Sequence, residues 1–192
     1  SGSVKFKGRE VEGTEEELAA MRLHEMGFIF QDINLLKNLS LIDNIMFPAL
    51  VSKKADKGAV SERARTLMQM TGIEELAEHS ITQASGGQLQ RVAICRALMN
   101  DPDIVFGDEP TGALDSKATE DILSILSEVN QRGTTVMLVT HDAKVAAKSE
   151  RVLFMADGRI VAQKKWNRYD AKQENIKERE EELMKWLVEN GL

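Results

Sequence analysis

The 192-residue sequence has a single cysteine, Cys95, no long apolar run and no excess of positive charge. One cysteine excludes an internal disulfide and is typical of a reducing compartment, and its place in a predicted helix indicates a buried, unreactive thiol. No apolar run approaches the roughly 18 residues of a transmembrane helix, and no secretory signal is visible. The formal net charge of −6 disfavours a general nucleic-acid binder, which would carry a basic face. We therefore expect a cytoplasmic chain that reaches a membrane only through a partner.

The sequence also lacks a P-loop, the motif G-x-x-x-x-G-K-[ST] in which backbone amides wrap phosphates and a lysine neutralises them. Gly8 and Gly13 have the required spacing, but Thr14 stands where the lysine is needed. Gly107 and Gly112 have the spacing as well, and no lysine follows them. The chain by itself is therefore expected to bind a nucleoside triphosphate weakly or not at all.

The rest of the composition, 42% hydrophobic and 29% charged, is typical of a globular protein that can bury a substantial core. Short apolar stretches at 28–30, 104–107 and 134–139 predict buried strands, with helices between them. The last stretch is continuously apolar, which predicts a sheet covered on both faces. This order predicts an α/β fold with a mixed sheet core, an antiparallel edge and a helical subdomain at about 32–100.

The most informative stretch is ASGGQLQRVAICRALMNDPDIVFGDEPTGALD. Four residues precede a helix predicted from Leu89 to Asn100: Ser85, Gly86, Gly87 and Gln88. Glycines let a backbone approach a ligand closely, and a helix N-terminus favours an anion. Behind this helix, a short strand delivers Asp108 and Glu109 to its carboxyl end, where open α/β sheets bind ligands.

Each of these features alone has a simpler explanation, because SGGQ is a common polar turn and acidic residues often follow strands. Their order along the chain has no such simple explanation. In this order the motifs make the chain strongly resemble the ATP-binding subunits of ABC transporters. ASGGQ stands where that family has its LSGGQ signature, IVFGDE is similar to its Walker B strand, and GALD to its D-loop. EPTGALD and the upstream QDINLL look most like the lipoprotein-releasing and macrolide-export branch. The resemblance covers about Gly2 to Ala162.

The resemblance implies an ATP-binding and ATP-hydrolysing role with Mg²⁺ as the cofactor. Asp108 would hold Mg²⁺ through its waters, and Glu109 would polarise the attacking water. Gln31, in the place of the Q-loop glutamine, would reach the metal and the water, and His141 would be the switch histidine. Asp115 belongs to the D-loop.

In the family, the signature completes the ATP site of a second subunit, so a head-to-tail homodimer is implied, docked on membrane-spanning transporter subunits at the inner face of the membrane. The family's P-loop precedes the hairpin expected at about 4–11, so the chain is expected to begin just after it and to be truncated at its N-terminus. Ala84 departs from the family's leucine, which would loosen packing beneath the turn. Residues 1–162 would form the ATPase domain, and 163–192 a C-terminal helical extension.

Three functions remain open from the sequence. The first is the ATPase that powers an ABC-type exporter or a lipoprotein or lipid extractor. The second is a non-catalytic module that docks on a transporter and lends its SGGQ to a partner. The third is an ABC-type ATPase of DNA repair, which the compact 32–83 segment disfavours because such chains usually insert long coiled coils there. The transported substrate is not encoded in these residues.

Overall fold

The computed structural model describes residues 3–51, 56–169 and 175–191, and the chain forms two compact units, residues 1–139 and 140–192. Among the described residues, no helix combines the length and the apolar character needed to cross a membrane.

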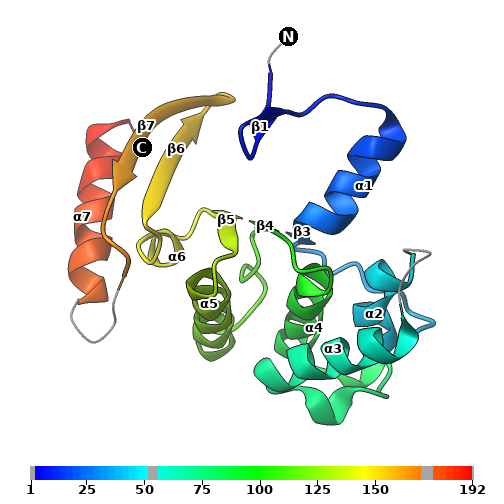
Figure 1. The fold of residues 1–192 in the computed structure, drawn as a ribbon. Helices are drawn as coiled ribbons and strands as arrows, with labels where there is room; N and C mark the ends of the chain where they lie inside the picture. The colour runs from blue at the N-terminus through cyan, green and yellow to red at the C-terminus, as the bar shows by residue number, and fades with distance from the viewer. Residues whose placement is uncertain (1–2, 52–55, 170–174, 192) are drawn as a thin grey trace. The chain divides into compact units, whose positions relative to one another are not determined.

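The core of the first unit is a three-stranded parallel sheet in the order β3-β4-β5 (Figure 1). Its strands are β3 (Met26–Ile29), β4 (Ile104–Asp108) and β5 (Thr135–Val139). Met26 pairs with Ile104, which pairs in turn with Thr135. The three predicted strands are confirmed, although β3 begins at Met26 rather than at residue 28. The described core sheet is all parallel, and antiparallel pairing occurs in two separate hairpins.

Two long helices pack against this sheet, α4 (Gly86–Leu98) on β3 and α5 (Ser116–Gln131) on β5. On α5 the buried side chains recur every three or four residues: Ile122, Leu123, Ile125, Leu126 and Val129. Such spacing gives a helix one continuous apolar face. The shorter α1 (Glu15–Glu25) begins with a capping box between Thr14 and Glu17 and leads directly into β3.

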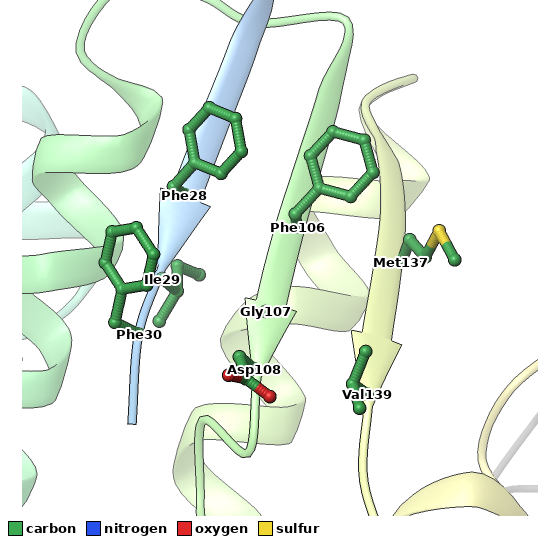
Figure 2. A pocket seen from close by; sticks show the side chains of 8 residues that line it. All are labelled: Phe28, Ile29, Phe30, Phe106, Gly107, Asp108, Met137 and Val139. Carbon is green, nitrogen blue, oxygen red and sulfur yellow. The ribbon is translucent and has the colours of Figure 1, made fainter. Parts of the chain in front are cut away.

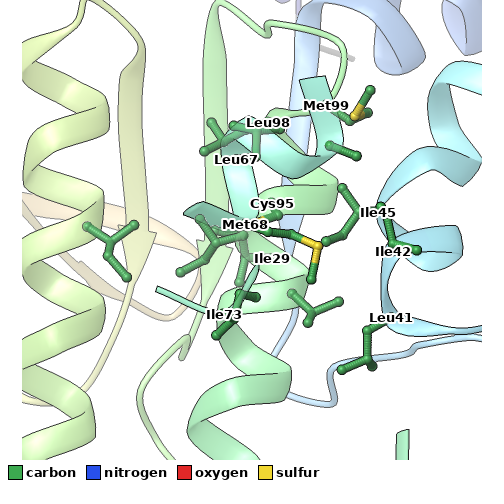
Figure 3. Close-up of a cluster of buried hydrophobic side chains, with 14 of the residues drawn as sticks. Ile29, Leu41, Ile42, Ile45, Leu67, Met68, Ile73, Cys95, Leu98 and Met99 are labelled. Atoms are coloured by element: carbon green, nitrogen blue, oxygen red, sulfur yellow. The ribbon is translucent and has the colours of Figure 1, made fainter. Parts of the chain in front are cut away.

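The predicted helical subdomain contains α2 (Leu41–Val51), α3 (Lys57–Met70), two short 3₁₀ turns (Glu74–Leu76 and Ile81–Gln83) and α4. Figure 3 shows the buried side chains of α2, α3 and α4 meeting beside Ile29 of β3. Cys95 lies inside this cluster, and burial raises the pKa of its thiol to about 12. The expectation of a buried thiol is therefore confirmed.

The second unit contains α6 (Ala143–Ala146), the strands β6 (Arg151–Ala156) and β7 (Arg159–Lys165), and α7 (Ile176–Glu189). The two strands pair antiparallel around Asp157 and Gly158, which both have positive φ, as the tight turn requires. On α7, Leu183 is fully buried, and the Arg179 guanidinium lies over the Trp166 ring at 5.0 Å. A smaller hairpin, β1 (Lys5–Phe6) with β2 (Arg9–Glu10), belongs to the first unit.

One face of the β3-β4-β5 sheet is exposed among the described residues, so the expectation of a sheet covered on both faces is wrong for them. On β5, Met137 is 45% exposed and Val139 58% exposed. Figure 2 shows Phe28, Phe106 and Met137 along the open side of the strands. The continuous apolar sequence of β5 does not distinguish the covered face from the open one, because both faces carry apolar side chains.

Glycine commonly ends a helix, but Gly27 lies inside β3, because helix α1 already ends at Glu25. A Cβ atom at Gly27 would lie 2.5 Å from the backbone oxygen of Ala97. The absence of a side chain therefore lets α4 approach the strand.

We predict that Gly27→Ala lowers the free energy of unfolding by about 1–3 kcal/mol, because β3 and α4 must separate to admit the methyl group. Urea denaturation followed by circular dichroism measures the change. The matched control is Gly58→Ala on α3, where the new Cβ would be 3.7 Å from its nearest neighbour and the change should be neutral or stabilising. Equal destabilisation by the two variants would contradict the packing argument.

Candidate functional site

Two of the predicted site residues follow neighbouring strands at the same edge of the core sheet. Asp108 is the last residue of β4, and Gln31 follows the last residue of β3 by two positions. Because β3 and β4 are parallel, their carboxyl ends meet at one edge, with Ile29 opposite Gly107. Both polar side chains are exposed there. The sheet thus presents an amide and a carboxylate where ligands bind to open α/β folds.

Glu109 adopts a backbone conformation that residues with a side chain rarely adopt, with φ of 43°. Its amide donates to the Val139 carbonyl at 2.9 Å, and its carbonyl accepts from the Gly112 amide at 3.0 Å. The first bond continues the β4–β5 ladder by one residue, and the second closes a tight turn. Strained backbone of this kind clusters at functional sites, which supports a functional role for Glu109.

Gln31 and Glu109 converge on the same glycine. A Cβ atom at Gly112 would lie 3.7 Å from Nε2 of Gln31 and 3.5 Å from Cβ of Glu109. The turn after β4 therefore lies beside the side-chain amide of Gln31, in the loop that follows β3. Sequence spacing could not predict that the Gln31 amide lies near this turn, because 78 residues separate Gln31 from Glu109 (109 minus 31).

The signature residues open helix α4. Ser85 is its N-cap, with Oγ accepting from the Gln88 amide at 3.3 Å, while the Gln88 side chain accepts from the Ser85 amide at 2.8 Å. Gly86 and Gly87 form the first turn of the helix, so the prediction that all four residues precede it is wrong. The first-turn N–H groups of a helix have no intrahelical acceptor, and because Ser85 Oγ accepts from Gln88, those of Gly86 and Gly87 are the ones that an anion could approach. The S-x-x-Q spacing could have predicted this capping box from the sequence.

The D-loop lies beside the signature within the same unit. Asp115 is the N-cap of α5 and accepts from the Ala118 amide at 2.8 Å. A Cβ atom on Gly87 would be 3.3 Å from Cβ of Ala118, and one on Gly86 would be 3.9 Å from Leu114. The starts of α4 and α5 are therefore neighbours, and Asp115 fixes the start of one of them.

His141 belongs to the second unit and follows the last residue of β5 by two positions along the chain. Its side chain is exposed. Its neighbour Asp142 donates its amide to Thr140 Oγ1 at 3.0 Å and caps α6. The switch role expected for His141 stays a prediction.

The geometry at Asp108 fits the expected Mg²⁺. This ion keeps several waters and is usually held by one or two carboxylates together with substrate phosphates, so a cage of protein ligands is not needed. Within the described parts of the chain, no three His, Cys, Asp or Glu side chains gather as a metal cluster. A single exposed carboxylate at a strand end, with the Gln31 amide oxygen at the same edge, supplies oxygen ligands of the right kind.

Beside Asp108, the open face of the sheet forms a shallow apolar concavity of about 100 Å³ (Figure 2). It is lined by side chains of all three strands, with Phe28 stacked on Phe106 at 5.5 Å between ring centroids. The candidate site therefore has an exposed carboxylate edge next to an apolar surface.

A parallel sheet with an amide and two carboxylates at its carboxyl edge, and two capped helix starts beside each other, is the arrangement of an α/β nucleotide-binding domain. The model of the ABC transporter family matches residues 1–112. The chain belongs to this family, as an ATP-binding domain of the export branch discussed above.

The curated relatives are longer proteins. A probable syringafactin export ATP-binding/permease protein of Pseudomonas syringae is 49% identical over 163 residues, which cover 84% of this chain and 25% of that protein. A macrolide export ATP-binding/permease protein of Hahella chejuensis is 45% identical over 163 residues, with the same coverage. The chain thus spans about a quarter of the length of these relatives.

Solved structures share the fold. The ATP-binding cassette MJ0796, as a dimer in a post-hydrolysis state with ADP and Pi, matches with a TM-score of 0.78 and 36% identity, covering 86% of this chain and 73% of that one. The cassette cbiO1 of Clostridium perfringens matches with a TM-score of 0.76 and 28% identity, covering 85% of this chain and 65% of that one. The predicted fold class and family are confirmed.

We predict that Ser85→Ala lowers the free energy of unfolding by about 1 kcal/mol, because the first turn of α4 loses its capping oxygen. Ser85→Asp keeps an acceptor and should recover most of that loss. Ser124→Ala, on an exposed position of α5, is the control and should change little. Thermal unfolding of the three variants gives the comparison, and a stable Ser85→Ala protein would show that the cap is dispensable.

Proposed function

We propose that this chain is the ATP-hydrolysing part of an ABC-type export or lipoprotein/lipid extraction system. The observation that carries the proposal is the convergence of Gln31 and Glu109 on Gly112, at the sheet edge where Asp108 is exposed. ATP hydrolysis needs a metal-holding carboxylate, a group that polarises water and a group that orients it, and these three side chains have suitable chemistry.

Each side chain is assigned one role. Asp108 holds Mg²⁺ through its waters, and the ion neutralises charge on the phosphates when it is bound. Glu109 accepts a proton from the attacking water, and the strained turn fixes its backbone. Gln31 orients the water through an amide that both donates and accepts without adding charge. His141 contributes a further hydrogen bond toward the γ-phosphate.

The signature acts on a second copy of the domain in a head-to-tail homodimer. Ser85, Gly86, Gly87 and Gln88 present a helix N-terminus, and Asp115 holds the neighbouring helix start. A helix N-terminus stabilises an anion that approaches along its axis. The dimeric state of the related cassette MJ0796 supports the arrangement.

The transport partner is proposed to be a membrane-spanning permease, with this chain at the inner face of the membrane. Relatives that join an ATP-binding and a permease part in one protein support this pairing. Residues 1–162 are proposed as the ATPase domain, with its helical subdomain at about 32–100, and 163–192 as a C-terminal extension.

A non-catalytic module that binds a transporter is the second candidate, and one observation favours it. No G-x-x-x-x-G-K-[ST] motif occurs in the 192 residues, so a phosphate-binding loop has to come from outside them for hydrolysis to occur. An ATPase assay on a version that carries a P-loop segment of a related cassette before Ser1 distinguishes the two candidates.

In that extended version, we predict that Glu109→Gln slows hydrolysis by roughly a hundredfold or more and leaves ATP binding intact, because the amide keeps the shape but is a poor proton acceptor. Steady-state turnover and a nucleotide-binding titration measure the two effects separately. Glu120→Gln, on an exposed position of α5, is the control and should keep full turnover. Turnover of Glu109→Gln close to that of the parent would remove Glu109 from the role of base.

A further inference from the structure

The loop that carries Gln31 has neither helix nor strand between β3 and α2. It spans residues 30–40, all within the described part of the chain. A loop of this length positions a side chain accurately only where other elements hold its backbone. Two side chains from neighbouring helices do so, Arg96 of α4 and Asn44 of α2.

Arg96 binds the loop just after Gln31. Its Nη1 donates to the carbonyl of Asn34 at 2.7 Å, and its Nη2 donates to the carbonyl of Ile33 at 2.9 Å. The backbone of Asn34 is left-handed, with φ of 51°, which separates this turn from extended chain. A planar guanidinium can bind two acceptors at once in a fixed orientation, so this contact fixes the direction of the loop as well as its position.

These two bonds are the main use of the Arg96 charge. Among the described residues, the hydrogen bonds of Arg96 go to these two backbone carbonyls, and burial lowers the pKa of its guanidinium. Phe30, Asn34 and Arg96 also line an open depression of about 310 Å³. Hydrogen bonds from Arg96 therefore help to set the position of the loop near Gln31.

Asn44 holds the far end of the same loop. Its Oδ1 accepts from the Leu36 amide at 2.7 Å, and its Nδ2 donates to the carbonyls of Leu36 at 3.1 Å and Ser40 at 2.9 Å. Asn44 is 1% exposed, so these bonds are shielded from water. The segment between Ile33 and Ser40 is therefore fixed to two helices of the subdomain.

We infer that Arg96 is a positioning residue that connects the start of helix α4 to the side chain of Gln31. Ser85 and Arg96 lie about three turns apart on one continuous helix. A displacement of α4 relative to the core sheet moves the carbonyls that Arg96 grips, and with them the loop that places Gln31 beside Gly112. Ligand binding at the signature, at the start of α4, in this way changes the position of the Gln31 loop, which Arg96 binds near the end of the helix. The catalytic consequence rests on the proposed function, whereas the mechanical connection does not.

The chain offers a matched control for Arg96. Arg63 of α3 also binds two consecutive backbone carbonyls, Met99 at 2.7 Å and Leu98 at 2.9 Å, and it contacts the Asp101 carboxylate at 3.3 Å. Arg96 is a residue of α4, and Arg63 binds carbonyls at the C-terminal end of α4. Of the two, Arg96 is the one that contacts the Gln31 loop. Arg96→Met and Arg63→Met each remove a guanidinium and keep an unbranched side chain.

The first experiment is hydrogen exchange of the 192-residue chain, measured at two loop amides: that of Leu36, which donates to Asn44 Oδ1, and that of Leu39, which donates to the Leu36 carbonyl. Arg96→Met should speed the exchange of these amides by roughly tenfold or more relative to core amides of β4. Hydrogen bonds from a charged donor favour the ordered loop over its open state by about that factor. Arg63→Met should leave this ratio unchanged. Arg96→Lys, which keeps the charge but donates from one point, should give an intermediate ratio and also covers the case in which Arg96→Met fails to fold.

The second experiment measures turnover in the version extended by a P-loop segment. Arg96→Met should lower kcat by roughly tenfold or more while KM for ATP changes little, because Gln31 is misplaced rather than lost. Absence of turnover in the unsubstituted extended protein would count against the proposed function, and the exchange result would still decide the mechanical connection. Equal loop exchange in Arg96→Met and Arg63→Met, or equal kcat in these two variants, would overturn the inference.

Discussion

Parallel pairing of β4 with both of its neighbours is the constraint on which the first unit depends. Because β3 and β4 run in the same direction, Gln31 and Asp108 are delivered to one edge although a whole helical subdomain separates them in the chain. The Glu109 amide still bonds to the Val139 carbonyl of β5, and the chain turns away from the sheet directly after this bond. Without this register, the same residues would be scattered over the surface.

Much of this could be predicted from the sequence, because the relevant signals are local or periodic. Apolar stretches bounded by polar residues indicated the three strands and the helices between them, α4 and α5 among them. The order of SGGQ and a strand ending in Asp-Glu indicated the resemblance to the ABC transporter family, and that resemblance implied the candidate site residues. Each of these signals lies within a few turns or one strand of the residue concerned.

Contacts between segments that are distant in the chain could not be predicted from the sequence. Glycine commonly stops a helix, whereas Gly27 is needed where β3 meets Ala97 of α4. The hydrogen bond from Arg96 to the Asn34 carbonyl joins residues that are 62 positions apart, and no local pattern predicts it. The apolar sequence of β5 does not by itself distinguish the open face of the sheet from the covered one, because both faces carry apolar residues. Its exposed Met137 and Val139 are visible only once the neighbouring elements are placed.

The central claim is that the carboxyl edge of this sheet is one part of an ATP site that is completed by a phosphate-binding loop. Isothermal titration with Mg-ATP of two proteins tests it most directly: the 192-residue chain, and the same chain preceded by a P-loop segment. The account predicts weak or undetectable binding by the first and tight, Mg²⁺-dependent binding by the second, which Asp108→Asn weakens. Equally tight binding by both, or binding by the second that does not depend on Asp108, would contradict it.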